Sequence, residues 1–173
     1  MLIQSPEFVR CIGCGALGPP GDGPTHRYME SSPGCWAIYG EVLAREYADS
    51  AYAVAHRQSV DAYAVQHPGR PSRQGIRSVG IHLVRLFLIL ERRFSDEAAA
   101  RAMPVISSGK DAFHWLTPPQ SMGTLTAMDV WKTDNAEGHQ RAVRAWAQSA
   151  WQAWAPHHEQ IRRWVPARFS DGA

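Results

Sequence analysis

Residues 73–93 read RQGIRSVGIHLVRLFLILERR, and this stretch decides the fold class. Ser72 before it is a good helix N-cap. The apolar residues recur at the helical period, at Ile76, Val79, Leu83, Leu86 and Leu90, and Val84, Phe87 and Leu88 widen the stripe. A stripe this wide is typical of a helix that is covered on most sides. We therefore predict a buried helix over residues 73–93 at the centre of the fold.

Start and stop signals on both sides of this helix predict further helices. Ser32 and Pro33 suit the cap and the first position of a helix, and His67-Pro68 suits the end of another. Pro156 lies inside the last apolar stripe, so we expect a kink or break there. The other predicted helices span residues 33–48, about 50–66, 96–104 with a stop at Pro104, a short segment from Thr126 to Trp131, and about 136–165.

No stretch alternates apolar and polar residues over six positions, so the predicted class is all-α. We expect an irregular bundle of five or six helices with a metal-stapled N-terminal loop, in a single domain over residues 1–173. Residues 1–34 would be the irregular metal-binding segment and residues 35–165 the bundle. The first three helices would run up, down and up, and the last would pack across them through its tryptophans.

Composition excludes several classes of function. Of 173 residues, 18 are Lys or Arg and 16 are Asp or Glu, and the cations form no cluster, so no nucleic acid is expected as a partner. The longest apolar run near the middle, Leu86–Leu90, is far shorter than the roughly 20 residues of a membrane helix, so no membrane is expected either. Residues 1–10 lack the apolar core of a secretory signal, and we expect a cytoplasmic location.

The cysteines point to a metal. Cys11 and Cys14 are two residues apart in a glycine-lined turn, a spacing that lets both thiolates reach one zinc ion. Cys35, on the first turn of a predicted helix, is the expected third ligand, because a helix N-terminus favours a thiolate. Residues 10–34 contain six glycines and four prolines, so this loop needs a metal to order it. A redox pair or two exposed thiols is the alternative, but an all-α chain lacks the βαβ context of a redox motif.

The fourth ligand follows from the pairing of two helices. If the helices over 33–48 and 50–66 turn near residues 49 and 50, Cys35 faces Ala64 and His67 lies one turn further on. His67 is the preferred fourth ligand. His26, on the loop that leads to Cys35, stays open as the alternative.

Pairing the predicted helices in the same antiparallel way also suggests a second cluster of polar residues inside the bundle. Glu41, His56 and His82 fall near one level of three helices, and Asp61 is close enough to support them. Two histidines and a carboxylate are the ligand set of many catalytic zinc and iron sites, so a second metal, zinc or iron, is a candidate here. The alternative is a hydrogen-bonded polar core without metal, because a histidine on an apolar face is more often a core residue than a ligand.

Three motifs resemble an uncharacterised bacterial family that is classified as a domain of unknown function. They are CIGCGA at residues 11–16, SPGCWAIYGEVLAREY at 32–47 and VDAYAVQHPG at 60–69. The resemblance implies a small bacterial protein and implies no activity.

Two functions therefore stay open. The first is a small zinc-binding helical protein that acts as a metal-dependent enzyme on a small organic substrate, with Glu41, His56 and His82 holding the reactive ion. The second is a structural-zinc scaffold that binds a protein partner.

Overall fold

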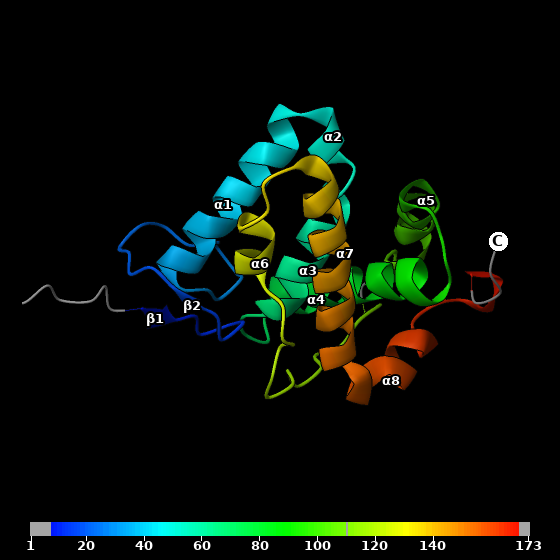
Figure 1. Cartoon of the computed structure of the whole chain (residues 1–173). Coiled ribbons are helices and arrows are strands. Elements are labelled where there is room, and N and C mark those ends of the chain that lie inside the picture. The colour runs from blue at the N-terminus through cyan, green and yellow to red at the C-terminus, as the bar shows by residue number, and fades with distance from the viewer. Residues whose placement is uncertain (1–7, 110, 170–173) are drawn as a thin grey trace, which may run out of the picture.

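The computed structural model describes residues 8–109 and 111–169 of the chain. A two-stranded hairpin, in which β1 (Val9–Arg10) pairs antiparallel with β2 (Leu17–Gly18), precedes a set of helices (Figure 1). The all-α prediction is confirmed, and this hairpin is the only sheet in the described part of the chain. The helices are α1 (Pro33–Ala48), α2 (Ser50–Ala53), α3 (His56–Gln66), α4 (Arg73–Leu86), α5 (Asp96–Ile106), α6 (Ala127–Trp131), α7 (Ala136–Ala153) and α8 (His158–Arg163).

The first helices begin and end close to the predicted residues, with one difference. Ser32 caps α1, since its hydroxyl accepts the amide proton of Cys35 at 3.3 Å. The single helix expected over residues 50–66 is broken between Ala53 and His56, which gives α2 and α3. Asp49 caps the short α2 by accepting from the Ala51 amide at 2.8 Å. This break changes which residues of α1 and α3 lie side by side.

The central helix forms as predicted, and its last turn widens. Val79, Leu83, Val84 and Leu86 are buried on α4, and the chain continues as a π-helical turn over Phe87–Glu91. Arg93 then takes a positive φ of 60°, which ends the helix.

Pro104 does not stop the next helix, contrary to the prediction. α5 continues through Pro104 to Ile106 and is capped at its start by Ser95. A proline removes one backbone donor and crowds the preceding turn, and in α5 only Val105 and Ile106 follow it, so the disturbance is confined to the last turn of the helix.

The C-terminal helices carry the aromatic core. Thr126 and Asp129 form a capping box at the start of α6. α7 and α8 are separated by a 3₁₀ turn over Ala155–His157, so the break predicted at Pro156 is confirmed. Three tryptophans of this region are almost fully buried, namely Trp146, Trp151 and Trp154.

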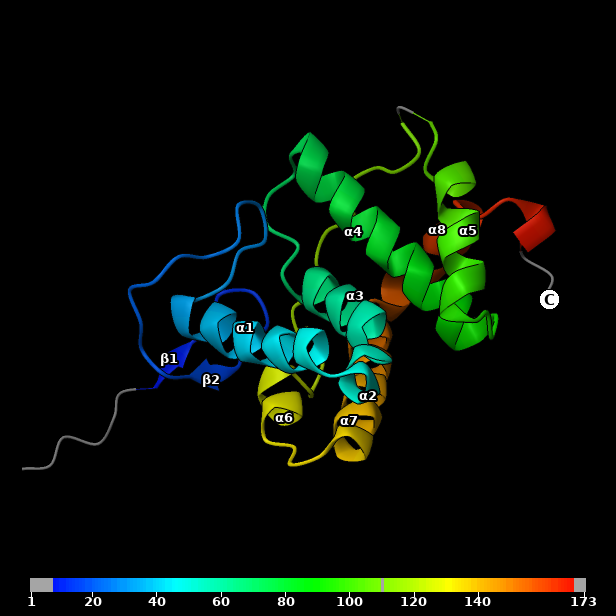
Figure 2. The same cartoon turned by 90° about the horizontal axis from the view of Figure 1, so that it is seen from above.

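α3 runs antiparallel to α1, as predicted, because Cys35, Tyr39 and Glu46 meet His67, Tyr63 and His56 in turn. α3 packs against α4 and α7, whereas α1 packs against α2 and α6 (Figure 2). The last long helix does lie across the bundle through its tryptophans. The Trp146 indole donates to Oε1 of Gln66 at 2.8 Å, and the Trp154 indole donates to the carbonyl of Val65 at 3.1 Å. The C-terminal end of α3 is thereby fixed in the core.

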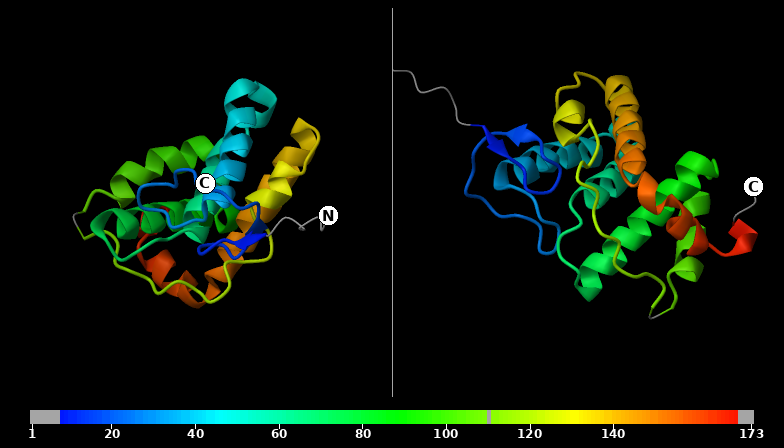
Figure 3. Two further views of the ribbon diagram at one scale, coloured as in Figure 1. Left: turned by 90° about the vertical axis from the view of Figure 1, so that its left-hand side faces the viewer. Right: turned by 90° about the horizontal axis from the view of Figure 1, so that it is seen from below.

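The hairpin and the C-terminal helix lie at opposite ends of the molecule (Figure 3). None of the helices in the described residues combines the length and the apolar character that crossing a bilayer requires. The hairpin lies next to the start of α1, and this is where the cysteines meet.

Candidate metal centre

The turn between β1 and β2 presents the first two cysteines. The Cys11 amide donates to the carbonyl of Ala16 at 2.8 Å, and the Gly15 amide donates to the carbonyl of Cys11 at 3.0 Å. Gly15 has a φ of 75°, a conformation that glycine adopts at little cost. The sequence Cys-x2-Cys-Gly therefore closes into a tight knuckle with both sulfurs on its inner side.

A second glycine lets this knuckle approach the rest of the molecule. A Cβ atom on Gly13 would lie 2.4 Å from the carbonyl oxygen of Glu30 and 2.4 Å from Cδ2 of His67. No side chain fits at that distance. The knuckle and the end of α3 are therefore in direct contact at Gly13.

Cys35 reaches the same point from the first turn of α1. Its thiol is 3.8 Å from the Cys14 sulfur, and the amide of Ser32, the cap residue, donates to the Cys11 sulfur at 3.4 Å. Gly34 allows the loop to pass close by, since a Cβ there would meet the carbonyl oxygen of Pro19 at 1.9 Å. The N-terminus of α1 thus contributes one thiol and one amide donor to the cluster.

His67 completes the group from the C-terminal end of α3. Its Nδ1 lies 2.7 Å from the carbonyl of Tyr63, so Nδ1 carries the proton and Nε2 is free to accept. Nε2 lies 3.5 Å from the Cys11 sulfur and 3.6 Å from the Cys35 sulfur. The Tyr63 ring stacks on the imidazole at 3.9 Å and holds its plane.

The four ligand atoms form one compact group. Those of Cys11, Cys14, Cys35 and His67 all lie within 4.8 Å of one another, and each of the four residues is buried. No other group of this kind occurs among residues 8–109 and 111–169. A metal ion fits this donor set, because three cysteine sulfurs and one imidazole nitrogen are ligands that a structural metal ion uses, and here they converge on one buried point.

The electrostatics of the group indicate how it would respond to a cation. Hydrogen bonds with Cys14 and Cys35 hold the pKa of Cys11 far below its usual range, against the effect of burial. Hydrogen bonds with Cys11 and Cys14, together with burial, raise the pKa of Cys35. Burial lowers the pKa of His67, but the sulfurs of Cys11 and Cys14 outweigh it and raise the pKa to about 9. A divalent cation would therefore displace protons from Cys35 and His67.

His26, the alternative fourth ligand, lies elsewhere. Its ring packs edge-on against Tyr28 at 4.4 Å and against Trp36 at 5.3 Å, and its Nδ1 accepts from the Tyr28 amide. Burial lowers the pKa of His26. The geometry thus assigns the fourth position to His67.

The residues predicted for a second metal do not come together. Glu41 is exposed and accepts from the Trp131 indole at 2.5 Å. His56 contacts Glu46 at 2.9 Å, and His82 contacts Asp61 at 2.7 Å. The expectation that Glu41, His56 and His82 share one point in the core is therefore wrong, and a catalytic role for any of them stays a prediction.

The break between α2 and α3 explains this difference. Cys35 meets His67, the ring of Tyr39 stacks on Tyr63 at 3.9 Å, and Glu46 meets His56. In each pair the partner on α3 lies about three residues beyond the position that a continuous helix from residue 50 would give it. Because of this shift, His67 lies beside Cys35, and His56 lies beside Glu46 and not near Glu41 as predicted.

Glu46 is the buried acid that our reading of the sequence missed. Its carboxylate is fully buried and lies 2.9 Å from His56 Nδ1 and 3.0 Å from His139 Nε2, and it accepts from Ser59 at 2.8 Å. The signal was present in the sequence, because Glu46 continues the helical spacing of Cys35, Tyr39 and Val42 on one face of α1. Asp61 is buried in a similar way and binds Arg85 as well as His82.

Comparison with known proteins places the chain in a family. Residues 9–155 match the profile of a family of unknown function, DUF5946. The chain belongs to this family. The match includes all four residues of the candidate metal centre and the helices from α1 to α7. No curated protein and no solved structure matches the chain. The function of this family is unknown.

Proposed function

We propose that this chain is a helical protein stapled by one structural zinc ion, held by Cys11, Cys14, Cys35 and His67. The spacing of the ligand atoms carries the proposal. Bonds of about 2.3 Å to sulfur and about 2.0 Å to nitrogen make the edges of a zinc tetrahedron about 3.8 Å for two sulfurs and about 3.5 Å for sulfur and nitrogen. In the structure the separations are 3.8 Å between the Cys14 and Cys35 sulfurs and 3.5 and 3.6 Å from His67 Nε2 to the Cys11 and Cys35 sulfurs, and all four ligand atoms lie within 4.8 Å of one another.

The ligand types support zinc over other metals. Three thiols and one imidazole are a soft donor set, whereas Mg²⁺ and Ca²⁺ prefer oxygen ligands. The set also favours a structural role. A catalytic zinc keeps one position open for water or substrate, while here four buried protein ligands would fill the tetrahedron.

The staple would order a part of the chain that cannot order itself. Residues 10–34 are rich in glycine and proline, and fixing such a loop costs about 1 kcal/mol per residue in backbone entropy. Structural zinc contributes on the order of 10 kcal/mol in small sites. The ion would join this loop to the start of α1 and the end of α3.

A metal-dependent enzyme that acts on a small organic substrate is the second candidate. The observation that favours it is Glu46, a buried carboxylate between His56 and His139. This candidate needs a second ion, zinc or iron, since the first ion has no open position. Within the described residues, however, the donor atoms of Glu46, His56 and His139 do not form a compact group like that of the four buried ligands. The scaffold is the better supported function, and its partner, a protein or a small molecule, would bind away from the zinc.

Metal analysis of protein purified without added metal tests the proposal. We expect one equivalent of zinc per chain, lost in Cys14→Ser and in His67→Ala, and kept in His26→Ala, the matched control. Cobalt in place of zinc should give the absorption of a tetrahedral thiolate site. Zinc well below one equivalent, with all three thiols freely reactive, would show the proposal to be wrong. A second ion that remains after Cys14→Ser would favour the enzyme.

A further inference from the structure

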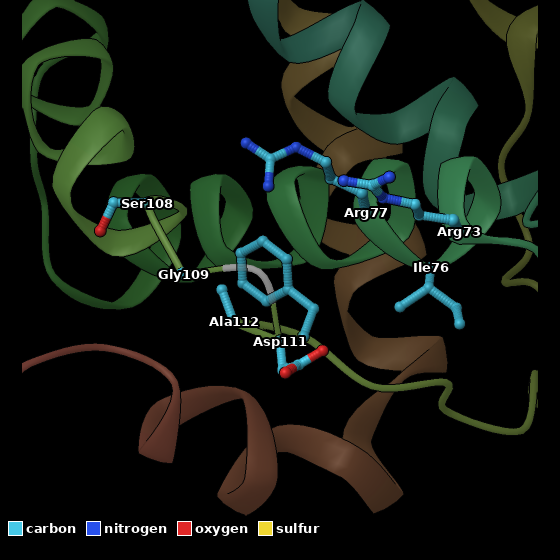
Figure 4. Close-up of a pocket in the computed structure, with 8 residues that line it drawn as sticks. Arg73, Ile76, Arg77, Ser108, Gly109, Asp111 and Ala112 are labelled. Carbon is cyan, nitrogen blue, oxygen red and sulfur yellow. The ribbon is translucent and has the colours of Figure 1, made fainter.

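A pocket of about 570 Å³ opens between the start of α4 and the segment after α5, away from the four metal ligands. Arg73 and Arg77 extend from α4 on one side, and Asp111 lies on the other (Figure 4). The volume falls within the range of small-molecule sites. Ile76 and Phe113 provide the apolar lining.

The two arginines carry charge that the described protein does not neutralise. Arg77 donates from Nη1 to the carbonyl of Ser107 at 3.0 Å, which fixes its guanidinium and leaves its other donors available. Arg73 forms no hydrogen bond or ion pair within residues 8–109 and 111–169. Neither side chain is paired with a carboxylate in that part of the chain. Arg73 and Arg77 lie one helical turn apart on α4 and line the same pocket, and the donors of a guanidinium group match the two oxygens of a carboxylate.

The apolar side of the pocket is rigid. Phe113 is 9% exposed, and its ring lies directly over Gly80, where an added Cβ would be 2.4 Å from the ring. The same ring packs edge-on against Trp164 at a centroid distance of 5.1 Å. The absence of a side chain at Gly80 therefore leaves room for the Phe113 ring, and the apolar wall of the pocket is formed before a ligand binds.

We propose that this pocket binds a small organic monocarboxylate, with the carboxylate on Arg73 and Arg77 and the apolar body over Ile76 and Phe113. Asp111 sets the preference for a single negative charge. A phosphate or a dicarboxylate would bring further negative charge towards the Asp111 carboxylate, and like charges repel. This site is independent of the zinc proposed above.

Benzoate is the probe for this site, and benzyl alcohol is its neutral counterpart. Titrations of the full-length, metal-loaded chain would be followed by amide shifts in two-dimensional NMR. We expect benzoate to shift the amides of residues 73–77 and 112–113, and benzyl alcohol to bind at least about tenfold more weakly. Binding should weaken as salt is added, because the guanidinium groups are exposed.

Three variants separate this site from unspecific binding. Arg73→Gln should weaken benzoate at least about fivefold, whereas Asp111→Asn should tighten it, because one substitution removes an attractive charge and the other a repulsive one. Arg144→Gln, an exposed arginine on α7, is the matched control and should change nothing. Equal binding of benzoate and benzyl alcohol, unchanged affinity in Arg73→Gln, or tighter binding of inorganic phosphate than of benzoate would each overturn the proposal.

Discussion

His67 Nδ1 lies 2.7 Å from the backbone carbonyl of Tyr63, and this contact turns the opposite nitrogen of the ring towards the Cys11 and Cys35 sulfurs. The acceptor belongs to the last turns of α3, so the helix itself selects the tautomer that can bind a metal. Metal-binding histidines commonly use such a second contact to fix the ring. The four-ligand group thus depends on helix geometry as well as on ligand identity.

Gly13→Ala should damage the metal centre without removing a ligand. The added methyl group would lie 2.4 Å from the Glu30 carbonyl and from the His67 ring, so the knuckle must move away from α3. We expect a loss of about 1–3 kcal/mol in the free energy of unfolding, together with weaker zinc binding. Thermal denaturation and zinc competition with a chelator measure both effects.

Gly23→Ala is the control for this substitution. It lies in the same loop, and nothing comes within 4 Å of its added Cβ. It should leave the melting temperature and the zinc affinity unchanged. Equal effects of the two substitutions would mean that the contact at Gly13 does not position the knuckle.

Zinc binding should release protons and strengthen as the pH rises. In the metal-free protein the pKa of His67 is about 9, above its usual 6.5, so its proton stabilises the fold fully below pH 6.5 and this contribution is lost as the pH rises through 9. Zinc needs the neutral ring and the thiolate of Cys35, whose pKa is raised by its hydrogen bonds to the other thiols. We therefore expect at least two protons released per zinc near neutral pH.

Calorimetry in buffers of different ionisation enthalpy counts these protons. The apparent zinc affinity should rise by at least about a hundredfold per pH unit between about pH 6 and pH 8. An affinity that is flat over this range would contradict the protonation states argued for His67 and Cys35.

Removal of zinc should open the N-terminal segment and leave the helices largely in place. The buried tryptophans Trp146 and Trp151 of α7 donate to Gln66 and Glu91, neither of which belongs to the metal centre, so far-UV circular dichroism should keep most of its helical signal after chelation while the melting temperature falls. Arg27 is exposed on the loop that the metal holds. We expect trypsin to cut after Arg27 much faster in the chelated protein, and to cut after Arg144 on α7 at an unchanged rate.

Glu46→Gln should destabilise the bundle by about 3 kcal/mol. The carboxylate is fully buried, with one oxygen facing His56 and Ser59 and the other facing His139, and an amide keeps only one of these two acceptor oxygens, so a buried hydrogen-bonding group loses its partner. Glu41→Gln on the same helix is the matched control, because Glu41 is exposed and should matter by less than about 1 kcal/mol. Urea denaturation of the two variants measures the difference, and equal stabilities would show that Glu46 is not a core determinant.

Much of the fold and most of the metal centre follow from local rules. Ser32, Thr126 and the apolar period of α4 predict elements that the structure contains, because caps and periodicity act over a few residues. The cysteine spacing predicts the knuckle for the same reason. His67 could be predicted as a ligand because the expected helix pairing places it only one turn beyond the residue that faces Cys35.

The partners of the buried acids could not be predicted from the sequence, because they depend on the register between neighbouring helices and on the rotation of each helix about its axis. The break at residues 54–55 has no strong signal, since neither Val54 nor Ala55 is a helix breaker, and it displaces every pair between α1 and α3 by about three residues. The contact of Glu46 with His139 on α7 joins residues far apart in the chain. Such contacts depend on how whole helices are placed, and a short pattern does not encode that.

The order of the four ligands along the chain has a consequence for biosynthesis. Cys11, Cys14, Cys35 and His67 all precede α4, whereas Trp146, Trp151 and Trp154 come from the last helices. On the ribosome the complete ligand set emerges while α7 is still untranslated. If the proposed zinc binds, a nascent chain can capture it and join its N-terminal loop to α1 and α3 before the aromatic side chains of α7 have been made.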